Sequence, residues 1–199
     1  MKNTGRLEDL LVPGAKVTLQ GNDNPERKTA YDLLSVYKPR LKWVNVDSLA
    51  PNALMKQYLE NDPLYDKVQP EFSFGDSRID FYMERENDKY LCEVKGCTLA
   101  QDMKRGIGLF PDAPTERGVK HLHELAEAAK KGYICTIAFV IQMNGIHLVL
   151  PNNAIQPEFG AALKEAAKAG VGINCYSCHV DADRIWITSE AGVTSIFLK

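Results

Sequence analysis

Apolar and polar residues alternate along two short runs near the middle of the chain, and this pattern predicts a β-hairpin. In residues 78–83 every second side chain is apolar, so Ile79, Phe81 and Met83 are expected on one face of a strand. Residues 89–97 form a second strand-like run. The polar residues between the two runs are typical of a tight turn.

The position of the turn fixes which residues of the hairpin face each other. If the turn is centred between Glu86 and Asn87, Asp80 lies directly opposite Glu93. Directly opposed residues share a face, with Cβ atoms about 4.5–5.5 Å apart. Lys95 is two residues beyond Glu93 and projects from the same face. The pattern therefore predicts two carboxylates and a lysine side by side.

These three side chains have two interpretations. Adjacent carboxylates repel each other, so a fold that keeps both ionised supplies a cation, here Lys95 or a divalent metal such as Mg²⁺. A metal held by Asp80 and Glu93 can bind a phosphate oxygen while Lys95 acts on the attacking water, which suits phosphodiester hydrolysis. The alternative is a surface charge ladder worth a few tenths of a kcal/mol. Spacing alone leaves both open, and the ladder is the commoner case.

Upstream of the hairpin, the sequence predicts strands, then a helix, then another strand. The expected ranges are 15–20, 31–36 and 42–47 for the first strands, 48–61 for the helix and 68–74 for the last strand. Ser48 is the candidate N-cap of the helix, and Pro51 suits its first turn.

Downstream of the hairpin, a loop rich in Gly and Pro leads into helices and strands. The expected elements are a loop at 106–118, a helix ending at Gly132, an apolar central strand at 133–143, a hairpin strand at 145–150, a helix at 157–169, a strand at 171–180 and a terminal hairpin over 184–199. Gln142, the late polar residue of the central strand, satisfies a neighbouring backbone group or orients a water. The whole order indicates an α/β fold of the mixed α+β kind.

The helix that follows the loop begins with a candidate phosphate site. Thr115 can cap this helix, and Arg117 and Lys120 lie in its first turns, where free N–H groups and positive charge favour a phosphate. The alternative is that both cations are simply exposed. His121 and His123 are two residues apart and do not share a helix face, so they make a poor metal pair.

The charge balance limits the extent of any nucleic-acid surface. The 199 residues include 24 Lys and Arg and 26 Asp and Glu, for a net charge of −2, so contact with nucleic acid must be local. Basic residues outnumber acidic ones in residues 1–56, with Tyr31, Tyr37 and Trp43 among them. This is typical of a groove that follows a phosphate backbone, but also of a solvated sheet face. The candidate contacts there are Arg6, Arg27 and Lys28.

Several classes of site and location are excluded by the sequence. No apolar run approaches the ~20 residues of a membrane span, and the first residues lack a signal-peptide core, so we expect a cytoplasmic protein without a membrane partner. Cys175, Cys178 and His179 match the C-x-x-C-H pattern of haem attachment. We reject haem because a strand would point the two cysteines to opposite faces. Zinc lacks a second pair of ligands.

Five stretches of the chain carry a family resemblance, namely residues 3–14, 23–29, 77–81, 93–95 and 109–118. Together they resemble the sugar fermentation stimulation protein A (SfsA) family. The resemblance implies an OB-fold-like region over 1–47, followed by a domain of the PD-(D/E)xK restriction-endonuclease type over 48–199, with αβββαβ core order and DNA binding as its activity. The sequence begins at what resembles the middle of the OB-fold, so we expect either a misassigned start or an open, incomplete barrel.

The resemblance also assigns roles to the residues of the hairpin. The nuclease motif falls on Asp80, Glu93 and Lys95. Asp80, Glu93 and the carbonyl of Val94 would bind Mg²⁺ or Mn²⁺, and Lys95 would act on the water or the transition state. The leading hypothesis is a metal-dependent nuclease that binds nucleic acid, with DNA expected in preference to RNA.

Two other functions stay open. One is a non-catalytic DNA-binding regulator that affects sugar metabolism, and the other is a scaffold protein without a nucleic-acid role. Salt-sensitive binding of DNA would exclude the scaffold. A homo-oligomeric state is also left open.

Overall fold

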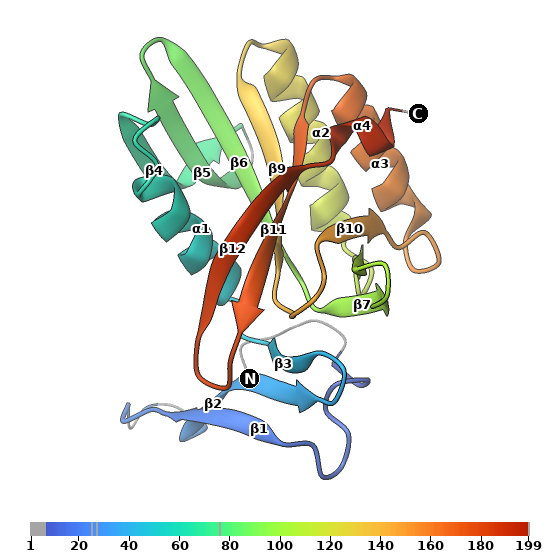
Figure 1. Cartoon of the computed structure of the whole chain (residues 1–199). Helices are drawn as coiled ribbons and strands as arrows, with labels where there is room; N and C mark the ends of the chain where they lie inside the picture. The colour runs from blue at the N-terminus through green and yellow to red at the C-terminus, as the bar shows by residue number, and fades with distance from the viewer. Residues whose placement is uncertain (1–6, 25, 27, 76, 199) are drawn as a thin grey trace.

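The computed structural model describes residues 7–24, 26, 28–75 and 77–198. A six-stranded sheet runs through the larger part of the molecule, in the order β12-β11-β9-β6-β5-β4 (Figure 1). Its strands are β4 (Lys67–Phe74), β5 (Ser77–Arg85), β6 (Asp88–Cys97), β9 (Ile134–Ile141), β11 (Gly172–Val180) and β12 (Ile185–Gly192). The central strands β6, β9 and β11 are parallel, whereas β4, β5 and β12 pair antiparallel with their neighbours.

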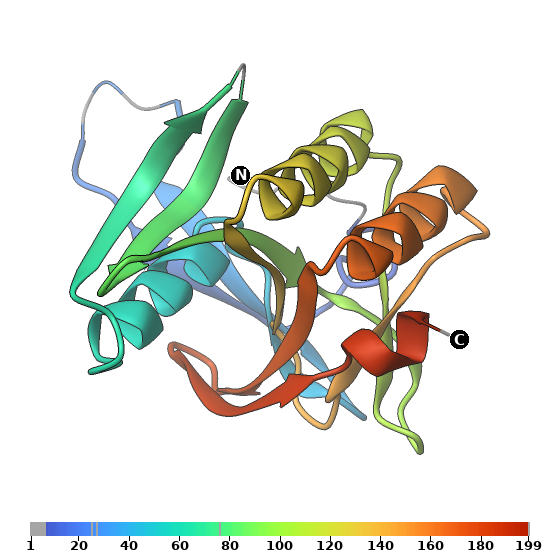
Figure 2. The same cartoon turned by 90° about the horizontal axis from the view of Figure 1, so that it is seen from above.

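Helices cover both faces of this sheet, so the larger part has three layers (Figure 2). The helices are α1 (Ala50–Glu60), α2 (Glu116–Lys130), α3 (Pro157–Lys168) and the short α4 (Thr194–Phe197). Along β9, Ile137 and Phe139 join the core cluster of α2 and α3, whereas Ala138 and Val140 join the cluster of α1. The continuous apolar pattern of β9 therefore reflects burial on both faces.

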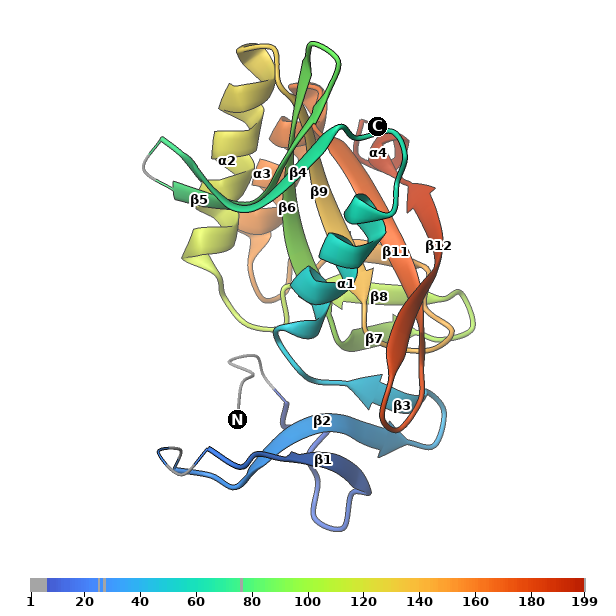
Figure 3. The ribbon, with the colours of Figure 1, turned by 90° about the vertical axis from the view of Figure 1, so that its left-hand side faces the viewer.

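The two small sheets lie at one end of the large sheet. β1 (Val17–Gly21), β2 (Tyr31–Lys38) and β3 (Lys42–Asn45) form an antiparallel sheet at the N-terminal end, below the larger part in Figure 3. A second small sheet contains β7 (Leu99–Asp102), β8 (Ile107–Phe110) and β10 (Leu148–Pro151). The chain thus has the mixed α+β fold, and α1, β4, β5, β6, α2 and β9 follow the predicted αβββαβ order with β7 and β8 inserted.

Several local predictions are confirmed. The hairpin pairs Phe81 with Cys92 and Arg85 with Asp88, which is the register expected from the polar turn. Thr115 caps α2, since its Oγ1 accepts a hydrogen bond from the backbone N–H of Gly118 at 3.0 Å.

The two cysteines of the haem-like pattern also lie as predicted. Cys175 belongs to the core cluster of α2 and α3, and Cys178 to the cluster of α1, so they lie on opposite faces of β11. None of the helices in the described part of the chain is long and apolar enough to cross a membrane.

Other predictions are wrong. The N-cap of α1 is Leu49 rather than Ser48, so this helix begins without a side-chain cap, although Pro51 does occupy its first turn. The terminal hairpin is absent from the described part of the chain, because residues 185–192 pair as one strand with β11 and a short helix follows.

The largest differences concern strands that pair over a long distance in sequence. The expected loop at 106–118 contains β8, and the expected hairpin strand at 145–150 overlaps β10, which pairs in parallel with β8. Ile79 packs in the cluster of α2 and α3, whereas Phe81 and Met83 pack in that of α1. Simple alternation fails between Ile79 and Phe81, where the ladder with β4 omits Asp80 and Glu71, and Glu71 has a φ of 56°.

The junction between the N-terminal sheet and the large sheet is tightly packed around Gly96. Gln142 donates from Nε2 to Asn45 Oδ1 at 2.7 Å and to the carbonyl of Asp47 at 3.0 Å. Its Oε1 lies against Gly96, where a Cβ atom would overlap it and would come 2.8 Å from Pro51 Cγ. Gln142 therefore satisfies backbone and side-chain groups, which is the first of its two predicted roles.

Replacing Gly96 by alanine is expected to lower the free energy of unfolding by about 1–3 kcal/mol, because the added methyl group overpacks a site whose neighbours are held in place. Urea unfolding of the full chain measures the change. Gly21→Ala is the matched control, since Gly21 is also a strand glycine but has open space around the added Cβ. Equal midpoints for the two variants would contradict the role given to Gly96.

Candidate active site

The candidate site forms where β5 and β6 separate. Their ladder runs from Arg85 and Asp88 to Phe81 and Cys92, and the regular pairing ends there. Beyond this point β5 stays paired with β4, while β6 continues along β9. The beginning of β5 runs toward α2, where Ser77 donates to a carboxylate oxygen of α2 (Figure 3). The divergence opens the sheet between β5 and β6 at the predicted carboxylates.

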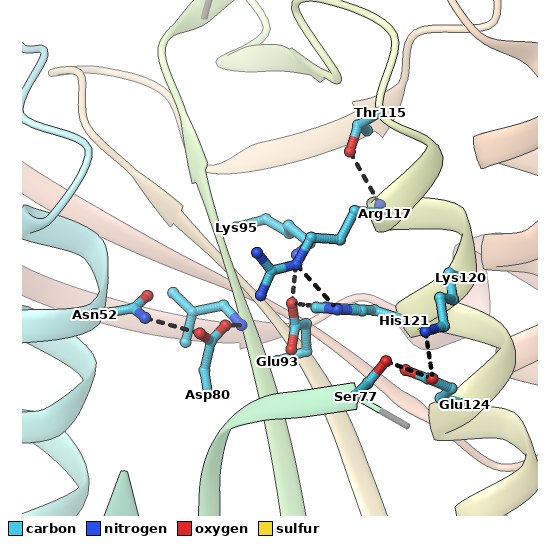
Figure 4. A network of polar contacts seen from close by, with 12 residues as sticks. Asn52, Ser77, Asp80, Glu93, Lys95, Thr115, Arg117, Lys120, His121 and Glu124 are labelled. Carbon is cyan, nitrogen blue, oxygen red and sulfur yellow. Dashed lines mark hydrogen bonds and ion pairs between the residues drawn. The ribbon is translucent and has the colours of Figure 1, made fainter. Parts of the chain in front are cut away.

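Asp80 is fixed at this divergence by two hydrogen bonds. Its Oδ2 accepts from the backbone N–H of Val94 at 2.8 Å, and its Oδ1 accepts from Asn52 Nδ2 of α1 at 2.8 Å (Figure 4). The side chain of Asp80 thus takes the place of a strand partner for β6. The ladder keeps the expected register up to Phe81 and Cys92 but ends before the predicted pair of Asp80 and Glu93, so Asp80 meets β6 through its carboxylate rather than its backbone.

Glu93 lies beside Asp80 and is buried, with 2% of its surface exposed. Its Oε1 accepts from Lys95 Nζ at 2.5 Å and contacts His121 Nδ1 within hydrogen-bonding distance (Figure 4). Its Oε2 is also buried but has no hydrogen-bond partner among the described residues. A buried carboxylate oxygen without a partner is costly unless another group binds it.

The two carboxylates have different electrostatic environments. Burial and the nearby charge of Glu93 raise the pKa of Asp80 above its ordinary value, and these effects outweigh the hydrogen bonds from Val94 and Asn52. Burial also acts to raise the pKa of Glu93, but the hydrogen bond of His121 and the charge of Lys95 outweigh it, so that pKa is lowered. Asp80 is therefore the carboxylate that lacks a sufficient counter-charge.

These contacts fit a divalent cation with oxygen ligands. A bound cation would give the buried Oε2 of Glu93 a partner and would offset the negative charge of Asp80. The carbonyl of Val94 would supply a third oxygen ligand. Among the described residues, no group of three or more His, Cys, Asp and Glu side chains is placed to hold a metal. A cation here would thus rely on two carboxylates, the peptide carbonyl and water, as Mg²⁺ often does.

Two cavities adjoin the site. One of about 320 Å³ is lined by Asn52, Val94, Gln142 and residues 110–115, so Gln142 lies beside the site as well as at the junction. The other, of about 460 Å³, is the basic pocket, lined by Ser77, Arg78, Glu116, Arg117, Lys120 and His121.

The structure brings only some of the predicted nucleic-acid contacts to the site. Arg117 and Lys120 both line the basic pocket, and Lys120 also forms an ion pair with Glu124 at 3.6 Å. Lys28 is exposed in the loop between β1 and β2, on the separate N-terminal sheet. Arg6 and Arg27 lie outside the described residues.

The aromatic side chains of the N-terminal sheet are divided between two environments. Trp43 is partly buried, packs edge-on against Tyr37 and lies under Lys16, whose Nζ is 5.4 Å from the ring centroid. Tyr31 is 61% exposed. Core packing thus accounts for much of the interleaved aromatic pattern, while Tyr31 stays available for stacking.

Two residues that contact the carboxylates were missed from the sequence. Asn52 reaches Asp80 from α1, and His121 reaches Glu93 from α2. The prediction that His121 and His123 point to different sides of the helix is confirmed, since His121 is buried and His123 is exposed. The apolar neighbours of His121 on its helix face were the available signal for its burial.

Comparisons with known proteins agree over both parts of the chain. A family model described as the SfsA N-terminal OB domain matches residues 1–46, and one described as the sugar fermentation stimulation protein RE domain matches residues 48–184. A sugar fermentation stimulation protein homolog of Ruminiclostridium cellulolyticum is 43% identical over 97% of this chain and 85% of the relative. A homolog of Desulfitobacterium hafniense is 44% identical over 96% of this chain and 82% of the relative.

A solved structure has the same fold. It is described as the structure of Pyrococcus furiosus SfsA in complex with Ca²⁺, and it matches with a TM-score of 0.83 and 25% identity over 96% of this chain and 83% of that chain. The N-terminal sheet is accordingly OB-like, and the family models and relatives extend over nearly all of the sequence. The chain belongs to the sugar fermentation stimulation protein (SfsA) family.

Proposed function

We propose that the protein is a divalent-metal-dependent nuclease that binds DNA in preference to RNA and hydrolyses phosphodiester bonds at Asp80, Glu93 and Lys95. The observation that carries this proposal is the buried Oε2 of Glu93, which has no partner in the described part of the chain although Oε1 of the same carboxylate is saturated. A charge ladder on a surface would not leave a buried oxygen in this state.

The neighbouring contacts support the same function. The arrangement of two carboxylates and a lysine agrees with the PD-(D/E)xK type of nuclease, and the basic pocket lies beside it. The P. furiosus structure is described as a complex with Ca²⁺, a hard cation with the same preference for oxygen ligands as Mg²⁺ and Mn²⁺. We propose Mg²⁺ or Mn²⁺ as the cofactor, held by Asp80, Glu93 and the carbonyl of Val94.

Each side chain then has a defined task. A bound divalent ion would neutralise charge on the phosphate and lower the pKa of a water. Lys95, whose side chain is 15% exposed, holds its ammonium group against Glu93 and presents positive charge at the site. That charge orients the attacking water or stabilises the negative charge that develops on the phosphate. Arg117 and Lys120 position neighbouring phosphates through the basic pocket.

We also propose a division of labour along the chain. Residues 1–47 would form the OB-like nucleic-acid-binding region, with Lys28 and Tyr31 exposed for contacts, and residues 48–199 the nuclease-like domain. The cytoplasm is the proposed location, since the buried thiols of all five cysteines are free.

The alternative is a DNA-binding regulator of sugar metabolism in which the site no longer cleaves. The family name favours it, because an effect on fermentation is simpler to explain by regulation than by cleavage. The geometry argues against it, since a protein without a metal gains nothing from burying the unpartnered oxygen of Glu93 beside Asp80.

Incubation of labelled single- and double-stranded DNA and RNA with the full chain tests the proposal, using Mg²⁺, Mn²⁺ or EDTA. We expect cleavage with either metal, none with EDTA, and faster cleavage of DNA than of RNA. Absence of cleavage together with salt-sensitive DNA binding would favour the regulator, because phosphate contacts weaken steeply as salt rises. If the protein neither cleaves nor binds nucleic acid, the nuclease and the DNA-binding regulator are both excluded.

A further inference from the structure

Two residues of α2, Arg117 and His121, are connected by hydrogen bonds to Glu93, a candidate metal ligand. The proposed mechanism gives His121 no task and gives Arg117 only a phosphate contact. We propose that His121 is a positioning residue for Glu93 and that Arg117 holds His121 in the tautomer needed for this task. The inference rests on the proposed function, because it concerns how Glu93 is prepared to bind a divalent ion.

The contacts form a continuous chain from the helix to the carboxylate. Arg117 and His121 are one turn apart on α2, and the side chain of His121 is buried, with 4% exposed. Arg117 Nε lies 3.2 Å from His121 Nε2, and His121 Nδ1 contacts Glu93 Oε1 within hydrogen-bonding distance (Figure 4). Both ring nitrogens of His121 are therefore engaged.

The chemistry of the guanidinium group decides where the imidazole carries its hydrogen. Arginine has donors only, so Arg117 Nε–H must donate and His121 Nε2 must accept through its lone pair. A neutral imidazole whose Nε2 accepts carries its hydrogen on Nδ1. His121 then donates from Nδ1 to Oε1 of Glu93, which is the orientation that a carboxylate requires.

This hydrogen bond fixes which oxygen of Glu93 is left for an ion. Oε1 accepts hydrogen bonds from His121 of α2 and Lys95 of β6, whereas the buried Oε2 has no partner among the described residues. The carboxylate cannot rotate without losing both donors. His121 thus acts as the outer-shell partner that orients a ligating carboxylate, and the loss of such a partner typically weakens metal binding about 10–100-fold.

Arg117 also faces the basic pocket, together with Arg78 and Lys120. Its Nε edge contacts His121 while the same guanidinium group lines the cavity in which a substrate phosphate would bind. Arg117 therefore has a positioning task in addition to the predicted phosphate contact, and it connects that contact to Glu93.

Calorimetric titration of the full chain with Mn²⁺ tests the proposal through three variants. His121→Leu removes the donor while filling the space, and we expect Mn²⁺ affinity to fall about 10–100-fold. His121→Asn keeps an N–H near the position of Nδ1, and we expect affinity within about threefold of wild type. His123→Leu is the matched control, because His123 is exposed on the same helix and has no contact with Glu93 in the structure; its affinity should be unchanged.

A second measurement reports the tautomer without any metal. In ¹⁵N-labelled wild type, long-range ¹H–¹⁵N correlation should show the His121 ring protonated at Nδ1 and bare at Nε2, with the signals assigned by their absence in His121→Asn. Arg117→Ala should relax this preference. A ring protonated at Nε2 in wild type would overturn the proposal even if His121→Leu fails to fold.

The outcomes separate this inference from the proposed function. Wild-type Mn²⁺ affinity in a folded His121→Leu variant would refute the positioning role while leaving the metal site intact. The positioning role would also be refuted if a folded His121→Asn variant lost as much Mn²⁺ affinity as His121→Leu. In that case a donated N–H at this position would not be what supports metal binding. Failure of wild type itself to bind Mn²⁺ would instead contradict the proposed metal site.

Discussion

Replacing Lys95 by alanine is expected to reduce cleavage by ~10²-fold or more, because the variant lacks the one cation that contacts Glu93 from within its own strand. Affinity for nucleic acid should stay within a few fold of wild type, since Lys95 is largely buried and the exposed cations Arg117 and Lys120 remain. Single-turnover cleavage of labelled DNA, together with a binding titration in Ca²⁺, separates the two effects.

Lys89→Ala is the matched control for this substitution. Lys89 is an exposed lysine of the same strand, paired in register with Glu84 at the far end of the hairpin. The Lys89→Ala variant should cleave and bind nucleic acid like wild type. Equal loss of activity in both variants would mean that general charge, rather than the position of Lys95, supports cleavage, and full activity in Lys95→Ala would remove Lys95 from the mechanism.

Replacing Asp80 by asparagine is expected to weaken Mn²⁺ binding by ~100-fold or more and yet to stabilise the metal-free protein at neutral pH. Loss of a ligand should cost at least as much as loss of an outer-shell partner, which is worth about 10–100-fold. The gain in stability follows from the raised pKa of Asp80, which shows that its ionised form is disfavoured in the folded state. Asn52 can turn its amide and keep its hydrogen bond to the new side chain.

The pH dependence has a definite sign. Because the folded-state pKa of Asp80 lies above its unfolded value, its contribution to stability is fully present below the unfolded pKa and is lost as pH rises through the folded pKa. The stability advantage of Asp80→Asn in EDTA should therefore be absent at low pH and should grow as Asp80 ionises. Urea unfolding from pH 4 to pH 8 measures this difference.

Saturating Mn²⁺ should reverse the order of stability. An ion at 100 times its dissociation constant stabilises the folded wild type by about 2.7 kcal/mol, whereas the variant gains little. A variant that is less stable than wild type in EDTA would contradict the electrostatic account of Asp80. An unchanged Mn²⁺ isotherm would remove Asp80 from the metal site.

The sequence determined the local structure on which the site depends. The polar turn and the two-residue period fixed the register of β5 and β6, because side chains in a strand alternate and a short turn allows few registers. Thr115 predicted the start of α2, because its side chain caps the first turn. Gly132 predicted the end, because its φ of 92° suits glycine. The family resemblance was equally readable, since it depends on short runs of residues.

The tertiary structure alone decided what surrounds the carboxylates. Asn52 and His121 are each 28 residues from the carboxylate they contact, and no local pattern indicates that α1 and α2 bring them to opposite sides of β6. Asp80 bonds the backbone of Val94 only because β5 separates from β6 beyond Phe81 while it stays paired with β4. These contacts arise from the packing of helices on both faces of a diverging sheet, and such packing depends on the whole chain at once.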